Sequence, residues 1–279
     1  MNKFAKSFYE NFSQYLIILF LILASFNLIA QDSDESEYIE SVTIIGSKED
    51  VKDLAGSGAV ISNEDLQKAM DTDIQKILTA VPGIYMRTEE GYGLRPNISI
   101  RGTAIERSGK VTIMEDGILV APAPYTASSA YYFPTTGRIH AVEVLKGPAV
   151  VSQGPQTIGG AINLISTPIP KVASGKFIQE IGENGMTRTH TYYGASQGNF
   201  GALVEIHEHA SDGYDSIANV GGDTGFDKSD LMIKTNYTSG NHSLTFKRVD
   251  LDETSNQSYV GLSQASFNAN PRMRYGATA

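Results

Sequence analysis

Histidine is the residue type whose spacing in this sequence could support metal chemistry. His207 and His209 are two positions apart, which places both imidazoles on one face of a β-strand, where they could bind a metal ion. His140, His190 and His242 stand alone in the sequence, so no third ligand is evident. We therefore interpret His207 and His209 as polar residues facing the interior of a β-structure and predict no metal site.

Catalytic arrangements are not expected either. No serine, histidine and aspartate, and no pair of carboxylates, stand in a context that favours catalysis, and the chain has no cysteine. The glycine-rich stretch 154–160 does not precede a helix that carries a lysine, so it lacks the context of a phosphate-binding loop. We expect a protein that is not an enzyme and that uses no cofactor.

The composition limits the function classes further. A hydrophobic content of 41% is that of a folded protein. The formal net charge is -9 and no run of lysine and arginine occurs, so the electrostatic pattern of a nucleic-acid-binding protein is missing. We exclude nucleic acid as a partner.

The N-terminal region has the layout of an export signal. Two lysines precede the apolar run 15–24, and smaller, more polar residues follow as far as residue 30. A single membrane anchor is the alternative, but Ser25 and Asn27 interrupt the run before it reaches the roughly 20 apolar residues of a spanning helix. We assign residues 1–30 to a signal peptide.

Residues 31–54 combine an acidic tail with a short β-prone run. The tail has the composition of a solvated segment, and the run is Ile39–Gly46. Such a run can add a strand to the sheet edge of a partner protein, or it can form the first strand of its own domain. Composition alone favours the second reading.

Residues 55–170 are expected to form an α+β domain. Ser62 or Asn63 caps a first helix, and a second helix begins near Asp73 and ends at Pro82 and Gly83. Short strands are predicted at 84–87, 98–102, 111–114, 118–120 and 142–148. Glycines at 147, 154, 159 and 160 predict tight turns after the last of these strands.

Residues 171–279 have a different organisation. Five successive strands are predicted at 177–181, 186–195, 200–211, 229–238 and 242–251, with alternating side chains and mostly alternating short and long connections. Strands of this length and rhythm are typical of a transmembrane β-barrel, although a β-sandwich gives a similar alternation. The predicted fold class is an α+β domain followed by the first antiparallel strands of a barrel.

Several motifs, taken in order, resemble those of TonB-dependent outer-membrane receptors. The matching stretches are the coupling box Ile39–Gly46, the plug signature Asp73–Gly83, Ile100–Gly102, Glu115–Gly117, Val142–Pro148, Gly154–Gln156 and Gly159–Asn163. Within that family, Pro96–Gly102, Ala121–Tyr125, Ser166–Pro170, Tyr259–Leu262 and Asn270–Tyr275 are similar to the ferric dicitrate receptor branch.

The resemblance implies a location and a transport function. Residues 55–170 would be the plug domain, and residues 171–279 the start of a barrel in the outer membrane of a Gram-negative bacterium. The box would bind TonB of the TonB–ExbB–ExbD complex from the periplasm, and the cargo would be a ferric chelate, ferric citrate or a similar siderophore. Another metal chelate or a cobalamin as cargo, or a secreted β-rich binding protein, is the alternative.

The resemblance also assigns residues to roles. Loops at one end of the plug would face the cargo, with Arg95, Arg107, Tyr125, Tyr92 and Ser108 as ligand-binding residues. Ile39, Glu40, Ser41, Val42, Thr43 and Ile44 would bind the coupling partner. Arg101, Gly102, Gly147, Gly154, Gly159 and Gly160 would be structural, with Arg101 in a buried ion pair between plug and wall.

Family members close a barrel of 22 strands, so five strands imply an N-terminal fragment that does not transport alone. The absence of a folded domain between residues 31 and 39 argues against the regulatory transducer subtype.

Overall fold

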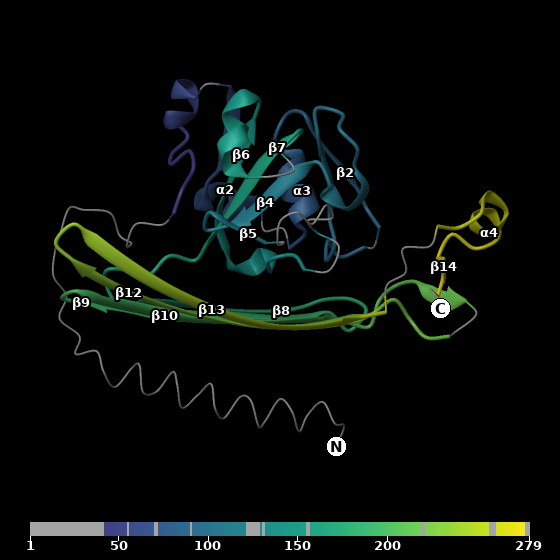
Figure 1. The fold of residues 1–279 in the computed structure, drawn as a ribbon. Helices are drawn as coiled ribbons and strands as arrows, with labels where there is room; N and C mark the ends of the chain where they lie inside the picture. Colours follow the sequence, from purple (N-terminus) through teal and green to yellow (C-terminus); the bar gives the residue numbers. More distant parts are fainter. Residues whose placement is uncertain are drawn as a thin grey trace, which may run out of the picture.

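The protein consists of an α+β domain that lies on a curved antiparallel sheet, here called the wall sheet (Figure 1). The computed structural model describes residues 42–276 except for 55, 70–71, 90, 121–128, 130–131, 155–156, 219–220 and 257–260. The predicted signal peptide, residues 39–41 of the coupling box and Tyr125 lie outside the described residues.

Two short helices cover one side of the α+β domain. After a 3-10 turn, η1 (Asp50–Asp53), come α2 (Asn63–Ala69) and α3 (Ile74–Thr79). Asp73 caps α3 because its Oδ1 accepts a hydrogen bond from the backbone N–H of Gln75 at 2.8 Å. Both helices occur where the capping residues predicted them.

The α+β domain is the predicted plug domain and is called the plug below. Its five-stranded sheet, here called the plug sheet, has the strand order β1-β6-β7-β4-β5. Its strands are β1 (Ser57–Ile61), β4 (Val111–Glu115), β5 (Ile118–Leu119), β6 (Ile139–Lys146) and β7 (Gly160–Ser166). β4 and β7 are parallel and the other pairs antiparallel. The main core of the domain forms from this sheet and α3, with Leu78, Val144 and Ile162 fully buried.

Smaller elements surround the plug sheet. β2 (Ile84–Arg87) and β3 (Asn97–Ile100) form a hairpin, and the 3-10 turns η2 (Glu106–Ser108), η3 (Thr136–Arg138) and η4 (Pro148–Gln153) connect the longer strands. Gly160, at the start of β7, needs to be glycine because a Cβ there would lie 2.5 Å from the carbonyl oxygen of Leu145.

The wall sheet confirms the five strands predicted after residue 170. They are β8 (Ser174–Ile181), β9 (Thr187–Gln197), β10 (Phe200–Ser211), β12 (Phe226–Ser239) and β13 (His242–Ser255). Each pairs antiparallel with its neighbours in the order β8-β9-β10-β12-β13, and the sheet is not closed. Short connections at 198–199 and 240–241 mark one end, and the long connection 212–225 marks the other. We call these the short-turn end and the long-loop end.

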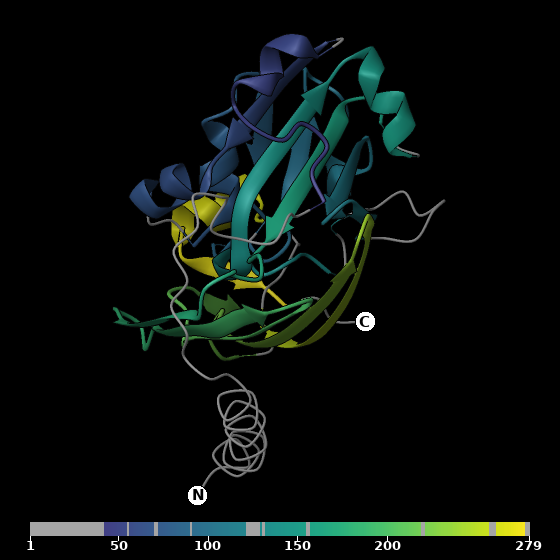
Figure 2. The same ribbon diagram turned by 90° about the vertical axis from the view of Figure 1, so that its left-hand side faces the viewer.

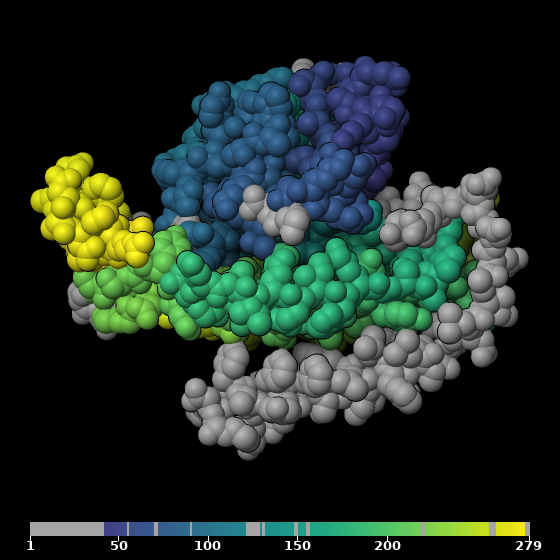
Figure 3. Space-filling view, turned by 180° about the vertical axis from the view of Figure 1, so that it is seen from behind, coloured from purple at the N-terminus to yellow at the C-terminus, as the bar shows by residue number. Residues whose placement is uncertain are grey.

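Three further elements were not predicted. β11 (Ser216–Ala218) lies in the long connection and pairs in parallel with β14 (Met273–Tyr275), near α4 (Gln264–Ala269). The side chain of Ser263 caps α4 by accepting from the N–H of Ser266 at 3.1 Å. In Figure 3 this C-terminal part, in yellow, projects beyond the plug at one end of the wall sheet.

The two faces of the wall sheet have opposite character. The plug lies on the concave face of the wall sheet (Figure 2). Glu205, Asp230 and Lys234 of this face are buried and contact plug residues. The convex face exposes apolar side chains, among them Phe177, Ile181, Leu244 and Phe246. This polar-inside, apolar-outside alternation follows the two-residue period of the strands.

Among the residues that the structure describes, no helix has the length and apolar composition required to cross a membrane.

The expectation that Ile39–Gly46 forms the first strand is wrong for its described part. Residues 42–46 have no strand structure. The N–H groups of Ile44, Ile45 and Gly46 instead donate to the carboxylate of Glu143. A side-chain acceptor therefore replaces the ladder hydrogen bonds that β-propensity predicted.

We expect Leu78→Ala to destabilise the plug strongly, because Leu78 is fully buried in its core. Loss of the side chain leaves a cavity, and the free energy of unfolding should fall by about 2–5 kcal/mol in urea denaturation followed by circular dichroism. Gln67→Ala, on the exposed side of α2, is the matched control and should change it by less than about 0.5 kcal/mol. Equal effects of both variants would contradict this description of the core.

Candidate functional site

Several deeply buried charges lie where the plug meets the wall sheet. Arg138, at the end of η3, is 1% exposed and donates to Glu115 of β4 and, through Nε, to Asp230 of β12 at 2.8 Å. Tyr132 accepts from Arg138 Nη2 at 2.9 Å. One guanidinium thus joins a plug carboxylate to a wall carboxylate.

A second set of contacts extends this network along the wall. Lys247 of β13 lies 2.8 Å from Glu115 Oε1 and 2.6 Å from Asp116 Oδ2, and Lys234 of β12 lies 3.4 Å from the same Asp116 oxygen. Asp116 also accepts from the N–H and the hydroxyl of Ser166. The turn that follows β4 is therefore held by two wall lysines and by the end of β7.

The protonation of the plug groups reflects these contacts. Burial by itself would raise the pKa of Glu115, but the charges of Arg138 and Lys247 outweigh it and hold the pKa below its ordinary value. Burial also opposes the lowering of the Asp116 pKa, which Lys234 and Lys247 produce. Burial raises the pKa of Tyr132 to about 12. Both carboxylates are ionised and Tyr132 is neutral at neutral pH.

Two of the residues predicted to bind the ligand, Arg95 and Tyr92, lie near the long-loop end. Arg95 forms an ion pair with Glu253 of β13 at 3.0 Å and donates to Ser255 Oγ at 3.1 Å, with 29% of its side chain exposed. The hydroxyl of Tyr92 lies 3.1 Å from Ser211 Oγ at the end of β10. Both side chains thus anchor one plug loop to the wall.

Arg107 occupies a strained turn on the same side of the plug. Its φ of 53° is in the left-handed region, its N–H donates to Asn97 Oδ1 at 2.7 Å, and its guanidinium lies 3.2 Å from Glu89. About a third of the side chain is exposed. Arg107 therefore keeps a partly open guanidinium close to one carboxylate.

Ser108 does not have the position that the sequence predicted. It is 0% exposed, and its hydroxyl accepts from the N–H of Ile98 at 2.9 Å and donates to the carbonyl of Pro96 at 3.0 Å. A buried hydroxyl with both roles used holds the loop together and is not available to a ligand.

Arg101 also differs from its predicted environment. It is exposed, with a φ of 55°, and its guanidinium lies beside Gly147, whereas a buried ion pair was predicted. Among the described residues no ion pair of Arg101 is present. The predicted structural glycines Gly102, Gly147, Gly154 and Gly160 all have positive φ, and Gly159 packs against Thr103 and Lys110.

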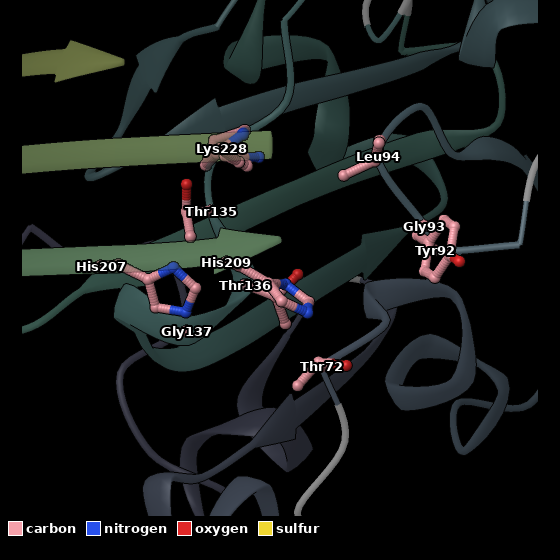
Figure 4. Close-up of a pocket in the computed structure, with 11 residues that line it drawn as sticks. Thr72, Tyr92, Gly93, Leu94, Thr135, Thr136, Gly137, His207, His209 and Lys228 are labelled. Carbon is pink, nitrogen blue, oxygen red and sulfur yellow. The ribbon is translucent and has the colours of Figure 1, made fainter. Parts of the chain in front are cut away.

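A small cavity of about 20 Å³ lies between the plug loops and β10 (Figure 4). His207 and His209 of the wall line it together with Lys228, and plug residues around Thr135 close it. Gly137 permits this contact, since a Cβ there would lie 2.3 Å from the His207 ring. The cavity has room for about one water molecule.

Strand pairing brings a third histidine to this pair. His190 lies opposite His207 in the β9–β10 register, with ring centroids 5.7 Å apart, although it stands alone in the sequence. Its Nε2 is 2.6 Å from Glu205 Oε1. In the part of the chain that the structure describes, no three such side chains converge in a way that could hold a metal ion.

A wider hollow of about 360 Å³ lies between α2, β6 and the first two wall strands. Its lining includes Lys176, Arg188 and His140, with Arg188 paired to Glu180 at 2.6 Å. Burial and the neighbouring lysines lower the pKa of His140 to about 4, so His140 is neutral at neutral pH.

Sequence reasoning missed most of the interface residues. Arg138, Asp230 and Lys247 were not singled out, and Glu115 and Asp116 were noted only as part of a turn motif. The signal available was the run of charged residues on one face of the predicted strands, which alternates with apolar residues. Their partners in the plug follow only from the three-dimensional arrangement.

The fold and this interface define a class of protein: a plug domain seated on the polar face of antiparallel wall strands. Residues 50–161 match the family described as TonB-dependent Receptor Plug Domain. Residues 50–161 therefore form a plug domain of the TonB-dependent receptor type.

Relatives and solved structures agree with this assignment. The chain is 30% identical over 151 residues to an iron-regulated outer membrane virulence protein of Vibrio cholerae, over 52% of this chain and 22% of that protein. It superposes on the unliganded ferric citrate transporter FecA with a TM-score of 0.69 and 23% identity, covering 86% of this chain and 37% of FecA. The ferric yersiniabactin uptake receptor FyuA of Yersinia pestis gives 0.62 and 19%, covering 74% and 33%. The two structural likenesses show the shared fold.

We expect Arg138→Met to lower the free energy of unfolding by about 3–5 kcal/mol in urea denaturation, because Asp230 and Glu115 lose a buried cation. Arg248→Met is the matched control. Arg248 is 63% exposed and pairs with Asp250 on its own strand, so its loss should cost less than about 1 kcal/mol. Similar losses in both variants would show that the buried network does not hold the plug.

Acid should weaken the same interface. Because the pKa values of Glu115 and Asp116 are lowered in the folded protein, their contribution is complete at neutral pH and is lost as the pH falls below the ordinary value of 4.5 for glutamate. The urea midpoint should therefore fall in two stages, first below about pH 6.5, where the unfolded state protonates His140, and then below about pH 4.5, where the two carboxylates are protonated. Glu115→Gln should make the decrease shallower, and an unchanged slope in that variant would argue against this origin.

Proposed function

We propose that this chain forms the plug and part of the wall of a receptor for energy-coupled uptake of a ferric chelate, with ferric citrate or a similar siderophore as cargo. The named relatives support iron as the transported element, since one is iron-regulated and two are a transporter and an uptake receptor for ferric chelates. The chain spans 22% of the first of these proteins and 37% of the second, so the activity of the whole receptor is inferred.

The main support for the proposal is that the predicted cargo-binding loop and the coupling box lie at different ends of the plug. Arg95 and Tyr92 meet the wall at its long-loop end, next to Glu253 and Ser211. The described part of the coupling box lies beside the turn at Asp116 and Gly117, whose contact with Lys247 is nearer the short-turn end. A cargo side and a coupling side on opposite ends are what a gated transporter requires.

Arg95, Arg107, Tyr92 and Tyr125 remain our proposed cargo contacts. A guanidinium can hold a carboxylate through two parallel hydrogen bonds, which suits an anionic citrate complex. Both arginines now pair with glutamates, Arg95 with Glu253 and Arg107 with Glu89. An anionic cargo would exchange with these glutamates for the same guanidinium groups.

For the coupling side we propose TonB as the partner of residues 39–44. No bond chemistry is needed, because the energy arrives as a pull on the box. The apolar convex face of the wall, with Phe177, Leu244 and Phe246 exposed, supports contact with outer-membrane lipid and disfavours a secreted β-rich binding protein.

Growth on ferric citrate as the sole iron source tests the cargo. Deletion of the gene should abolish this growth, and the intact gene should restore it. Unaltered growth of the deletion strain would remove the citrate assignment, and growth on other ferric chelates or on cobalamin would then identify the replacement.

We expect Val42→Pro to abolish uptake while leaving binding of cargo to cells intact, because proline removes an N–H donor from the strand lent to the partner. Val42→Ala keeps that donor and should transport at a rate close to that of the wild type. Normal uptake by the proline variant would place the coupling segment elsewhere in the chain.

A further inference from the structure

A charged residue stands in the middle of the plug sheet without a role in the interface. Glu143 lies on β6 between Val142 and Val144, which are both fully buried, and is itself 1% exposed. A carboxylate in such a place is costly unless hydrogen bonds replace its water. The contacts of Glu143 therefore indicate what it is there to hold.

Three consecutive backbone N–H groups converge on this carboxylate. Ile44 donates to Oε2, and Ile45 and Gly46 donate to Oε1, each at 2.8 Å. Gly46 has a φ of 98°, a conformation that glycine adopts readily and that lets the third N–H turn toward the same oxygen. The backbone at the downstream end of the coupling box is therefore held by a side chain of the plug sheet and does not pair with it as a strand.

Asn163, on the neighbouring strand β7, orients Glu143. Its Nδ2 donates to Glu143 Oε2 at 2.8 Å and to the carbonyl of Val42 at 3.3 Å. Its Oδ1 accepts from the N–H of Gly117 at 2.9 Å, which fixes the direction of the amide. Two residues of adjacent central strands thus bind the backbone of residues 42–46 on both its donor and its acceptor sides.

Apolar contacts add to the polar ones. Ile44 and Ile45 pack against a small cluster formed by Met114, Leu145, Val150 and Ala161. These contacts are short-range and involve side chains, so they can be released without opening the hydrogen-bond ladder between β6 and β7.

We infer that Glu143, positioned by Asn163, is the anchor that holds the downstream end of the coupling box and delivers a pull on the box to strand β6. The inference rests on the proposed function for the source of the pull, but the anchoring itself does not. Since β6 lies between β1 and β7, force that enters at Glu143 reaches an interior strand of the plug sheet directly.

Spin labelling tests the anchor without any cargo. The chain has no cysteine and Thr43 is exposed, so Thr43→Cys gives this chain a single nitroxide, which lies inside the box. In the purified receptor the label should be immobilised. Glu143→Gln should raise the ratio of mobile to immobile label by about tenfold, because the neutral amide cannot accept from all three N–H groups. Glu183→Gln, in an exposed turn of the wall, is the matched control and should leave the spectrum unchanged.

A second variant acts from the side of the box. Ile45→Pro removes one N–H donor and leaves the hydrogen bond between Glu143 and Asn163 intact. This variant therefore tests the anchor even if Glu143→Gln does not fold. It should also mobilise the label. An immobile label in a folded Glu143→Gln receptor, or in Ile45→Pro, would overturn the anchor.

Delivery of the pull is tested in cells with radioactive iron supplied as ferric citrate. Glu143→Gln should bind it at the surface as the wild type does but take it up at least about tenfold more slowly, whereas general misfolding would reduce both. A mobile label with normal uptake would overturn the delivery step. Absence of uptake by the wild type would instead reject the cargo of the proposed function, while the label would still report on the anchor.

Discussion

The contact on which the arrangement depends is the guanidinium of Arg138 held between a plug carboxylate and a wall carboxylate. Buried charges lose their water when the plug meets the wall, and this loss is balanced only if each charge finds its partner in good geometry. The position of the plug and the register of the wall strands are therefore determined together. A shift of β12 by one residue would move Asp230 to the opposite face of the sheet, and Arg138 Nε would lose its carboxylate acceptor.

This dependence explains why the polar face of the wall is charged rather than apolar. Apolar packing would bind the plug wherever shapes fit, whereas Glu115, Asp116, Lys234 and Lys247 fit in one placement. Charged groups are also well hydrated once such an interface opens, so separation of the plug from the wall would leave no apolar surface of this kind in water. The ion pair of Arg95 with Glu253 at the long-loop end belongs to the same type of interface.

Local sequence signals predicted most of the elements. Caps and apolar spacing gave α2 and α3, and alternation gave the five wall strands, because each of these patterns acts within one element. Pairings between elements could not be obtained in this way. Strand register places His190 opposite His207, and the surrounding loops bury Ser108. The N–H groups of Ile44–Gly46 donate to Glu143 and do not form the strand that their β-propensity predicts. Each of these contacts joins residues that are distant in the sequence. Local sequence patterns do not indicate which distant residues meet.

The order of strands in the plug sheet has a consequence for how the chain assembles. Ser57 pairs with Lys146 and Val111 with Gly160, so the plug sheet is completed only when segments far apart in the chain have met. The wall strands pair with their sequence neighbours across connections as short as those at 198–199 and 240–241. Loop-closure entropy makes high contact order slow to fold, and local hairpins form faster. In this protein the surface that receives the plug can be ready before the plug has closed its own sheet.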